Sequence, residues 1–167
     1  YEFGPDEPAA NRNAVYISYL DSVHYMRPRY LRTPLYHTIL AGYLSDVKRR
    51  GFTSVHIWAC PPTRGADYIF HRHPRDQRTP GWERLRIWYN EMLRIAQAEG
   101  TVVEAGSLFT DHFILPSKKR LRATVPPPYF PRHHWLKQLG YIAISRGKRG
   151  ALLKVKAAAV PTRRNRS

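Results

Sequence analysis

The chain has 167 residues, with 28 Lys or Arg against 12 Asp or Glu and a net charge of +16. This length suits one domain with a sizeable core, and the single cysteine excludes an internal disulfide and a multi-cysteine zinc site, which fits a reducing compartment. We expect neither a signal peptide nor a membrane partner, because the first residues lack a leader pattern and no apolar run approaches the roughly 20 residues of a membrane helix.

The charge is divided unevenly along the chain. Residues 1–111 hold 14 Lys or Arg and all 12 acidic residues, a net charge of +2, whereas residues 112–167 hold 14 basic residues and no acid, a net charge of +14. The first part is typical of a globular domain and the second of a basic tail. The basic runs at 118–122 and 163–166 fit nuclear-targeting or nucleic-acid patches and a solvated tail equally well.

The chain opens with residues 1–13, which are rich in Pro, Asn and acidic side chains and predict a loop. Apolar, aromatic and β-branched residues then alternate over 15–20, so a strand is expected there. Residues 22–32 predict a second loop.

A helix is expected next, with Thr33 as its N-cap and Pro34 at its first position. Apolar residues recur at helical spacing up to Val47, and Gly51 ends the helix. Arg32 and the Thr33 hydroxyl would then lie beside a helix N-terminus, where N–H groups and partial positive charge suit a phosphate group. A plain helix cap fits the same residues.

A second strand is predicted over the apolar residues 52–60, covered on both faces of a sheet and ended by two prolines. After a long loop, a second helix is expected from Trp82 to Glu99, with Gly100 as its stop, and residues 101–104 predict a third strand. Strands that alternate with helices of more than ten residues indicate an α/β domain. Beyond Phe113 the periodic signals fade.

Several stretches of the sequence, in order, resemble the central part of the CREB-binding-protein-type histone acetyltransferase domain. They are YISYLDSVHYMRP (16–28), LRTPLYHTILAGYL (31–44), HIWACPP (56–62) and DYIFHRHP…Q…P (67–80), followed by RLRIWY (84–89). The resemblance covers roughly residues 13–105, PPYF (127–130) matches a later family motif, and the residues after Leu108 resemble plant members.

The family resemblance implies a central mixed β-sheet flanked by helices, an acetyltransferase-like core without the family's N-terminal strands. Residues 1–130 would form the central part of the catalytic domain, and residues 131–167 a basic, divergent and disordered C-terminal segment. The implied activity is transfer of an acetyl group from acetyl-CoA to lysine amines of histones and other proteins, in the nucleus and in transcriptional coactivation, with transcription factors bound through the parent protein. No metal is implied.

The family resemblance also implies roles for individual residues. The acetyl-CoA contacts would come from Leu20, Asp21, Ser22, Arg32, Thr33, Thr79, Arg84 and Trp88. Tyr89 would be the general acid, Trp58 an orienting residue, and Pro80 part of the lysine tunnel.

The residues themselves leave core packing open as an alternative for Tyr89 and Trp58. Trp88 and Tyr89 are neighbours on a predicted helix and about 100° apart, so one can face cofactor while the other points into a tunnel. We expect Arg86, three residues before Tyr89, to lower the tyrosine pKa and so bring it closer to that of a thiol.

Other candidate sites have simpler interpretations. Cys60 and a histidine could form a nucleophile pair, but this cysteine follows a strand and the family uses no covalent cysteine. His71 and His73 could share a metal ion, yet no third ligand is evident, so a solvated loop or a hydrogen-bonded imidazole is favoured. His133 and His134 are interpreted in the same way.

The sequence departs from the family after its late Tyr-Phe motif, where the family continues with Glu-Gly-Asp. Here Tyr129-Phe130 is followed by Pro131-Arg132-His133-His134-Trp135, and no acidic residue follows Asp111. The acidic groups that help to receive a basic substrate are therefore replaced. Two alternatives follow: an inactive fragment that binds acetyl-CoA without turnover, and a basic nucleic-acid-binding module with weak contacts through the C-terminal segment.

Overall fold

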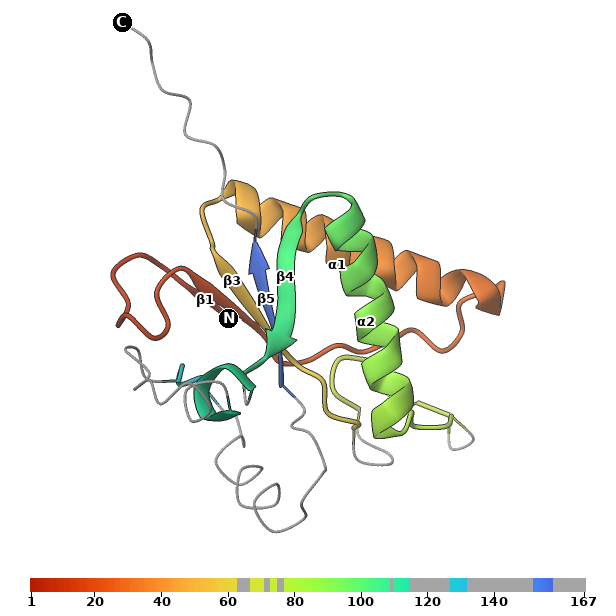
Figure 1. Cartoon of the computed structure of the whole chain (residues 1–167). Coiled ribbons are helices and arrows are strands. Elements are labelled where there is room, and N and C mark those ends of the chain that lie inside the picture. The colour runs from red at the N-terminus through yellow and green to blue at the C-terminus, as the bar shows by residue number, and fades with distance from the viewer. Residues whose placement is uncertain are drawn as a thin grey trace, which may run out of the picture.

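The computed structural model describes residues 1–62, 67–70, 73–74, 77–108, 110–114, 127–131 and 152–157, with 113, 114 and 152–157 described by their backbone. Figure 1 shows its helices and strands. In chain order they are β1 (Glu2–Phe3), β2 (Ala14–Ile17), the 3₁₀ turn η1 (Arg29–Leu31), α1 (Arg32–Arg49), β3 (Ser54–Trp58), α2 (Trp82–Ala98), β4 (Val102–Ser107), the π-helical turn η2 (Thr110–Ile114) and β5 (Leu152–Ala157).

The strands form one mixed sheet in the order β1-β2-β3-β5-β4. β2 and β3 are parallel, in register from Ala14 opposite Ser54 to Ile17 opposite Ile57, and α1 is the crossover between them. All other neighbours in the sheet are antiparallel. The expected α/β fold, with a mixed sheet and helices, is confirmed, and the parallel pair explains the long helical connection.

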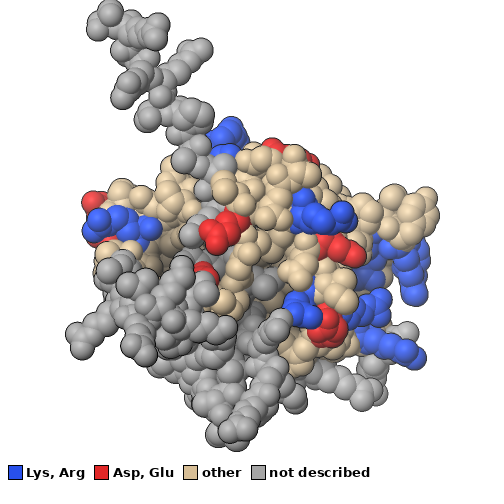
Figure 2. All heavy atoms as spheres, in the orientation of Figure 1, with Lys and Arg blue, Asp and Glu red and all other residues tan. Residues whose placement is uncertain are grey.

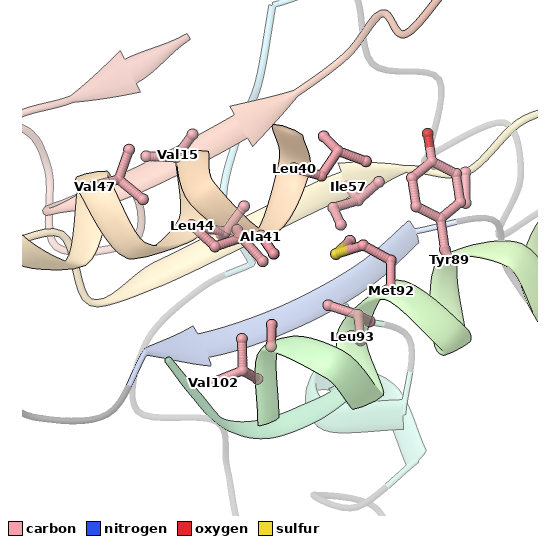
Figure 3. Close-up of a cluster of buried hydrophobic side chains, with 13 residues drawn as sticks. Val15, Leu40, Ala41, Leu44, Val47, Ile57, Tyr89, Met92, Leu93 and Val102 are labelled. Carbon is pink, nitrogen blue, oxygen red and sulfur yellow. The ribbon is translucent and has the colours of Figure 1, made fainter. Parts of the chain in front are cut away.

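Both long helices pack on one face of the sheet (Figures 1 and 3). Every second residue of the parallel strands faces them, as the predicted alternation requires, and Val15 and Ile57 are completely buried. The helices contribute eight members of this core cluster, namely Leu40, Ala41, Leu44 and Val47 from α1, and Tyr89, Met92, Leu93 and Ala96 from α2. The two amphipathic stripes read from the sequence therefore meet each other over the sheet.

The opposite face of the sheet carries a second apolar cluster around Phe130. The Phe130 ring is completely buried and stacks on Tyr16, with ring centroids 4.5 Å apart and planes 8° apart. The segment around it is fastened by Asn11, whose Nδ2 donates to the Tyr129 carbonyl at 2.6 Å and whose Oδ1 accepts from the Tyr129 N–H at 3.0 Å. Residues 127–131 thus cover β2 and β3 on the face opposite the helices, and β3 is buried on both faces as predicted.

Both long helices end at the glycines that the sequence indicates. Gly51 and Gly100 have φ values of 94° and 69°, a region that residues with a Cβ rarely adopt. The next residue folds back in each case: the Phe52 N–H donates to the Val47 carbonyl at 3.1 Å, and the Thr101 N–H to the Ala96 carbonyl at 2.9 Å.

The start of α1 differs from the prediction. The helix begins at Arg32, directly after η1, and its N-cap position is Leu31, which makes no side-chain cap bond. Thr33 is therefore not the N-cap, because the 3₁₀ turn already supplies helical backbone before it. Pro34 is tolerated since it still lies in the first turn, where N–H groups lack intrahelical partners.

Two strands lie where the sequence predicted none. β1 forms within residues 1–13 and pairs Glu2 with Val15 and Phe3 with Ala14. β5, over residues 152–157, lies between β3 and β4 inside the sheet. The predicted third strand also runs further, to Ser107, because it pairs with β5 along its length.

Replacing Phe130 with Ala should lower the free energy of unfolding by about 3–5 kcal/mol, because it leaves a ring-sized cavity on the face of the sheet opposite the helices. Chemical denaturation followed by tryptophan fluorescence measures this change. Tyr129→Ala is the matched control: this side chain is 70% exposed, so we expect a change within about 0.5 kcal/mol. Equal effects of the two variants would contradict the role assigned to Phe130.

Candidate active site

A single cleft contains all of the predicted site residues. It has a volume of about 1210 Å³, larger than the roughly 300–1,000 Å³ usual for small-ligand pockets. The predicted residues that line it are Leu20, Asp21, Ser22, Arg32, Thr33, Trp58, Thr79, Pro80, Arg84, Trp88 and Tyr89. Residues separated by almost 70 positions in the chain therefore share one concave surface.

The parallel strands explain where this cleft lies. Its lining comes from residues that follow β2 and β3, from the N-terminal parts of α1 and α2, and from residues just before α2. Ligands of open α/β sheets bind outside the carboxyl ends of parallel strands, and these two strands end at this edge.

The cleft is strongly cationic. Five arginines line it against one described carboxylate, that of Asp21, and they are Arg27, Arg29, Arg32, Arg78 and Arg84. Figure 2 shows Lys and Arg side chains gathered on the side of the molecule where α1 begins. Sequence reasoning missed three of the five, Arg27, Arg29 and Arg78, although the first two flank Pro28 in the loop before α1, which was a usable signal. A ligand with several phosphates matches this charge.

The start of α1 is held in place by hydrogen bonds from other elements. Arg32 Nη2 donates to Ser22 Oγ at 2.7 Å, and Trp88 Nε1 of α2 donates to Thr33 Oγ1 at 3.4 Å. The Val23 N–H donates to the Tyr36 hydroxyl at 2.9 Å, a contact that the sequence did not reveal. The cationic side of the cleft is thus pre-organised rather than free to rotate.

The Asp21 carboxylate is hydrogen-bonded to groups of the protein itself. Its Oδ1 accepts from the Ser22 N–H at 2.9 Å and lies 2.6 Å from His73 Nε2, and its Oδ2 accepts from the N–H groups of Ile69 and Phe70 at 3.1 and 3.0 Å. The carboxylate therefore joins the loop after β2 to a segment almost 50 residues away.

Tyr89 belongs to both the core and the cleft. The side chain is 4% exposed and packs with the core cluster, while its hydroxyl points away from α2 (Figure 3). No hydrogen-bond partner of this hydroxyl occurs among the described residues. Burial raises the phenol pKa well above its usual range.

Arg86 does not lower the Tyr89 pKa, so that prediction is wrong. Its guanidinium bonds to Glu83 on the solvent-facing side of α2, with Nη2 and Oε1 2.6 Å apart. Trp88, by contrast, does lie beside Tyr89, edge to face at 5.0 Å between ring centroids, and is itself only half-buried. The neighbouring aromatic residues therefore face different surroundings, as the helical geometry predicted.

Of the remaining candidate residues, the structure describes some, and the others lie outside the described residues. His73 is a buried, hydrogen-bonded imidazole, as one of the two interpretations held. His71, His133, His134 and the basic runs at 118–122 and 163–166 are outside the described residues. Within the described ranges, no three or more His, Cys, Asp or Glu side chains gather as metal ligands, and no helix has the length and apolarity to cross a bilayer.

Comparison with known proteins identifies the family. The profile described as "Histone acetyltransferase domain KAT3" matches residues 1–144. The chain belongs to this family. The histone acetyltransferase HAC4 of Arabidopsis thaliana is 47% identical over an aligned length of 142 residues, and the alignment covers 80% of this chain and 10% of that protein.

Two further relatives of this KAT3 domain come from an animal and another plant. Protein cbp-1 of Caenorhabditis elegans is 47% identical over 134 residues, covering 80% of the chain and 6% of that protein. The probable histone acetyltransferase HAC-like 1 of Oryza sativa is 46% identical over 142 residues, covering 80% and 8%. The chain thus spans a tenth or less of the length of these relatives. The family named from the sequence motifs is confirmed, and β5 lies beyond the matched residues.

Cys60 should react slowly with iodoacetamide at neutral pH. It is half-buried beside Trp58, and burial raises the pKa of its thiol, so it carries less of the reactive thiolate than a free thiol with a pKa of about 8.5. We expect alkylation several-fold slower than in the unfolded chain at pH 7.5, with a rate that still rises above pH 9. A rate that levels off below pH 8.5 would contradict the raised pKa.

Proposed function

We propose that this KAT3 domain binds acetyl-CoA in the cleft and transfers its acetyl group to lysine amines of histones and other proteins. The observation that carries the proposal is that Arg32 and Tyr89 line the same cleft. A cation suited to phosphate and a buried phenol suited to a leaving group thus face one ligand-sized space. The family membership and the names of the relatives point the same way.

The residues of the cleft fit coenzyme A by their chemistry. Its pyrophosphate and ribose phosphate need guanidinium and N–H donors, which five arginines and the beginning of α1 can supply. Ser22 and Thr33 hold these groups in position, and Thr79, Arg84 and Trp88 would complete the cofactor contacts. When bound, acetyl-CoA supplies the acetyl thioester at which transfer occurs.

Tyr89 would act as the general acid of this transfer. A neutral lysine amine forms a C–N bond to the acetyl carbon while the C–S bond breaks; the amine loses a proton to solvent and the sulfur receives one from the Tyr89 hydroxyl, which solvent restores. The pKa values of a thiol and tyrosine, about 8.5 and about 10, already make this donation uphill by about 2 kcal/mol. Burial of Tyr89 widens that gap, so its proton moves late, after the sulfur has gained most of its charge.

The other two residues of the proposed chemistry have positioning tasks. Trp58 is the last residue of β3 and packs against the Phe130 cluster on the face of the sheet opposite the helices. It can therefore fix the shape of the cleft near the reacting atoms. Pro80, just before α2, would line the tunnel through which the lysine arrives. The attacking lysine, with a pKa of about 10.4, loses its ammonium proton to solvent before it reacts.

The proposed setting is chromatin in the nucleus. Transcription factors would be met through other parts of the parent protein, and the basic end of the chain would add at most weak contacts to nucleic acid. One feature favours a second candidate, a module that binds acetyl-CoA without turnover: Pro131 stands where an acidic, substrate-receiving residue is expected. Turnover with a histone peptide distinguishes the two candidates.

Tyr89→Phe should lower the rate of acetyl transfer by about 100- to 10,000-fold, because it removes the proton donor and keeps the buried ring. Transfer from acetyl-CoA to a histone tail peptide is followed by thiol release, and coenzyme A affinity should stay within twofold. Tyr43→Phe is the control, since that hydroxyl donates to Glu2 at the far end of α1. Transfer as fast as in the wild type would remove Tyr89 from the mechanism.

Arg32→Ala should weaken coenzyme A binding by about tenfold or more, as expected for a charge-assisted phosphate contact. Titration followed by tryptophan fluorescence reports this, because Trp88 and Trp58 line the cleft. Arg49→Ala, at the exposed opposite end of α1, removes the same charge and should leave affinity nearly unchanged. Equal losses in both variants would mean that only net charge matters.

A further inference from the structure

Asp21 presents an electrostatic problem for a phosphate-binding cleft. It is the one carboxylate among the described lining residues, and five arginines share that lining. A free carboxylate beside bound phosphate would repel it. A carboxylate has about four lone-pair sites, and all four are taken here, two on each oxygen, by the donors from Ser22, Ile69, Phe70 and His73.

His73 is the side chain that completes this arrangement. The side chains of His73 and Asp21 are each 10% exposed, and the Nε2–Oδ1 distance of 2.6 Å is the shortest of the four. The backbone N–H of His73 donates to Asp67 Oδ1 at 3.1 Å. His73 does not line the cleft, whereas Tyr68 and Pro74 on either side of it do. His73 therefore supports the part of the lining around Tyr68 and Pro74 without lining the cleft itself.

We propose that Asp21 and His73 form a positioning pair that sets the affinity of the cleft for acetyl-CoA without touching the cofactor. This inference rests on the proposed function and changes one part of it: Asp21 would act through its protein partners and not as a direct cofactor contact. The pair joins two parts of the cleft lining, the loop after β2 and the residues Tyr68 and Pro74.

The effect of the pair reaches the phosphate-binding cation through one further residue. Ser22 donates its N–H to Asp21 Oδ1 and accepts from Arg32 Nη2 through its hydroxyl. Loss of the His73 side chain would leave one lone pair of the Asp21 carboxylate without a donor, beside the arginines of the cleft. It would also make the position of the Arg32 side chain less fixed. Both consequences weaken phosphate binding, and neither touches Tyr89 or the reacting atoms.

The test compares His73→Leu with His73→Gln. Leucine removes the donor, whereas the glutamine amide can donate from nearly the same place as Nε2. We expect His73→Leu to raise the Kd for coenzyme A and the KM for acetyl-CoA by about tenfold, with kcat at saturating acetyl-CoA within twofold. His73→Gln should recover most of the affinity. Asp46→Asn, an acid of α1 paired with Arg50 away from the cleft, is the charge control and should change nothing.

A double-variant cycle tests the direct contact. If Asp21 works through His73, Asp21→Ala and His73→Leu together should lose little more affinity than Asp21→Ala alone. Additive losses would show that Asp21 contacts the cofactor itself and would overturn the proposal, as would unchanged affinity in His73→Leu, or a lower kcat and Tm at constant KM. A wild-type chain that fails to bind coenzyme A would overturn the proposed function and this inference together, whereas the other outcomes concern the pair alone.

Discussion

The parallel pairing of β2 with β3 is the constraint on which the cleft depends. Because the two strands run the same way in register, both release the chain at one edge of the sheet. The crossover α1 must return over the helical face, which brings its first turn back beside that edge. Arg32 and Thr33 thereby meet residues that follow both strands, and α2, packed on the same face, adds Trp88 and Tyr89. The site is thus a consequence of strand direction more than of any single contact.

Burial and hydrogen bonding serve different purposes at two residues of the cleft. Tyr89 lies in an apolar core, where loss of solvent keeps its phenol protonated. The Asp21 carboxylate is hydrogen-bonded by four donors of the protein, which leaves the arginines available for a ligand. A buried phenol that retains its proton and arginines that are available for a ligand would suit the proposed reaction, whose cosubstrate carries a thioester and phosphates.

Sequence patterns predicted what depends on neighbours along the chain and missed what depends on distant partners. The two long helices were expected nearly to the residue, because apolar stripes and the glycines at 51 and 100 are local signals. The residues of the cleft were found by family motif, not by periodicity. Arg86 was misassigned since spacing alone cannot tell a tyrosine neighbour from a competing glutamate, here Glu83. Three of the four donors to Asp21 lie about 50 residues away, and no local pattern indicates them.

The place of β5 in the sheet bears on how the molecule is made. β3 and β4 do not pair with each other; each pairs with residues 152–157. On a ribosome, β2, α1 and β3 can assemble early, but β4 lacks its described partner in the sheet until β5 is synthesised. Such late, long-range pairing slows folding and leaves two strand edges exposed to other chains in the interval. Newly made copies of this domain should therefore need chaperone protection until residues 152–157 have joined the sheet.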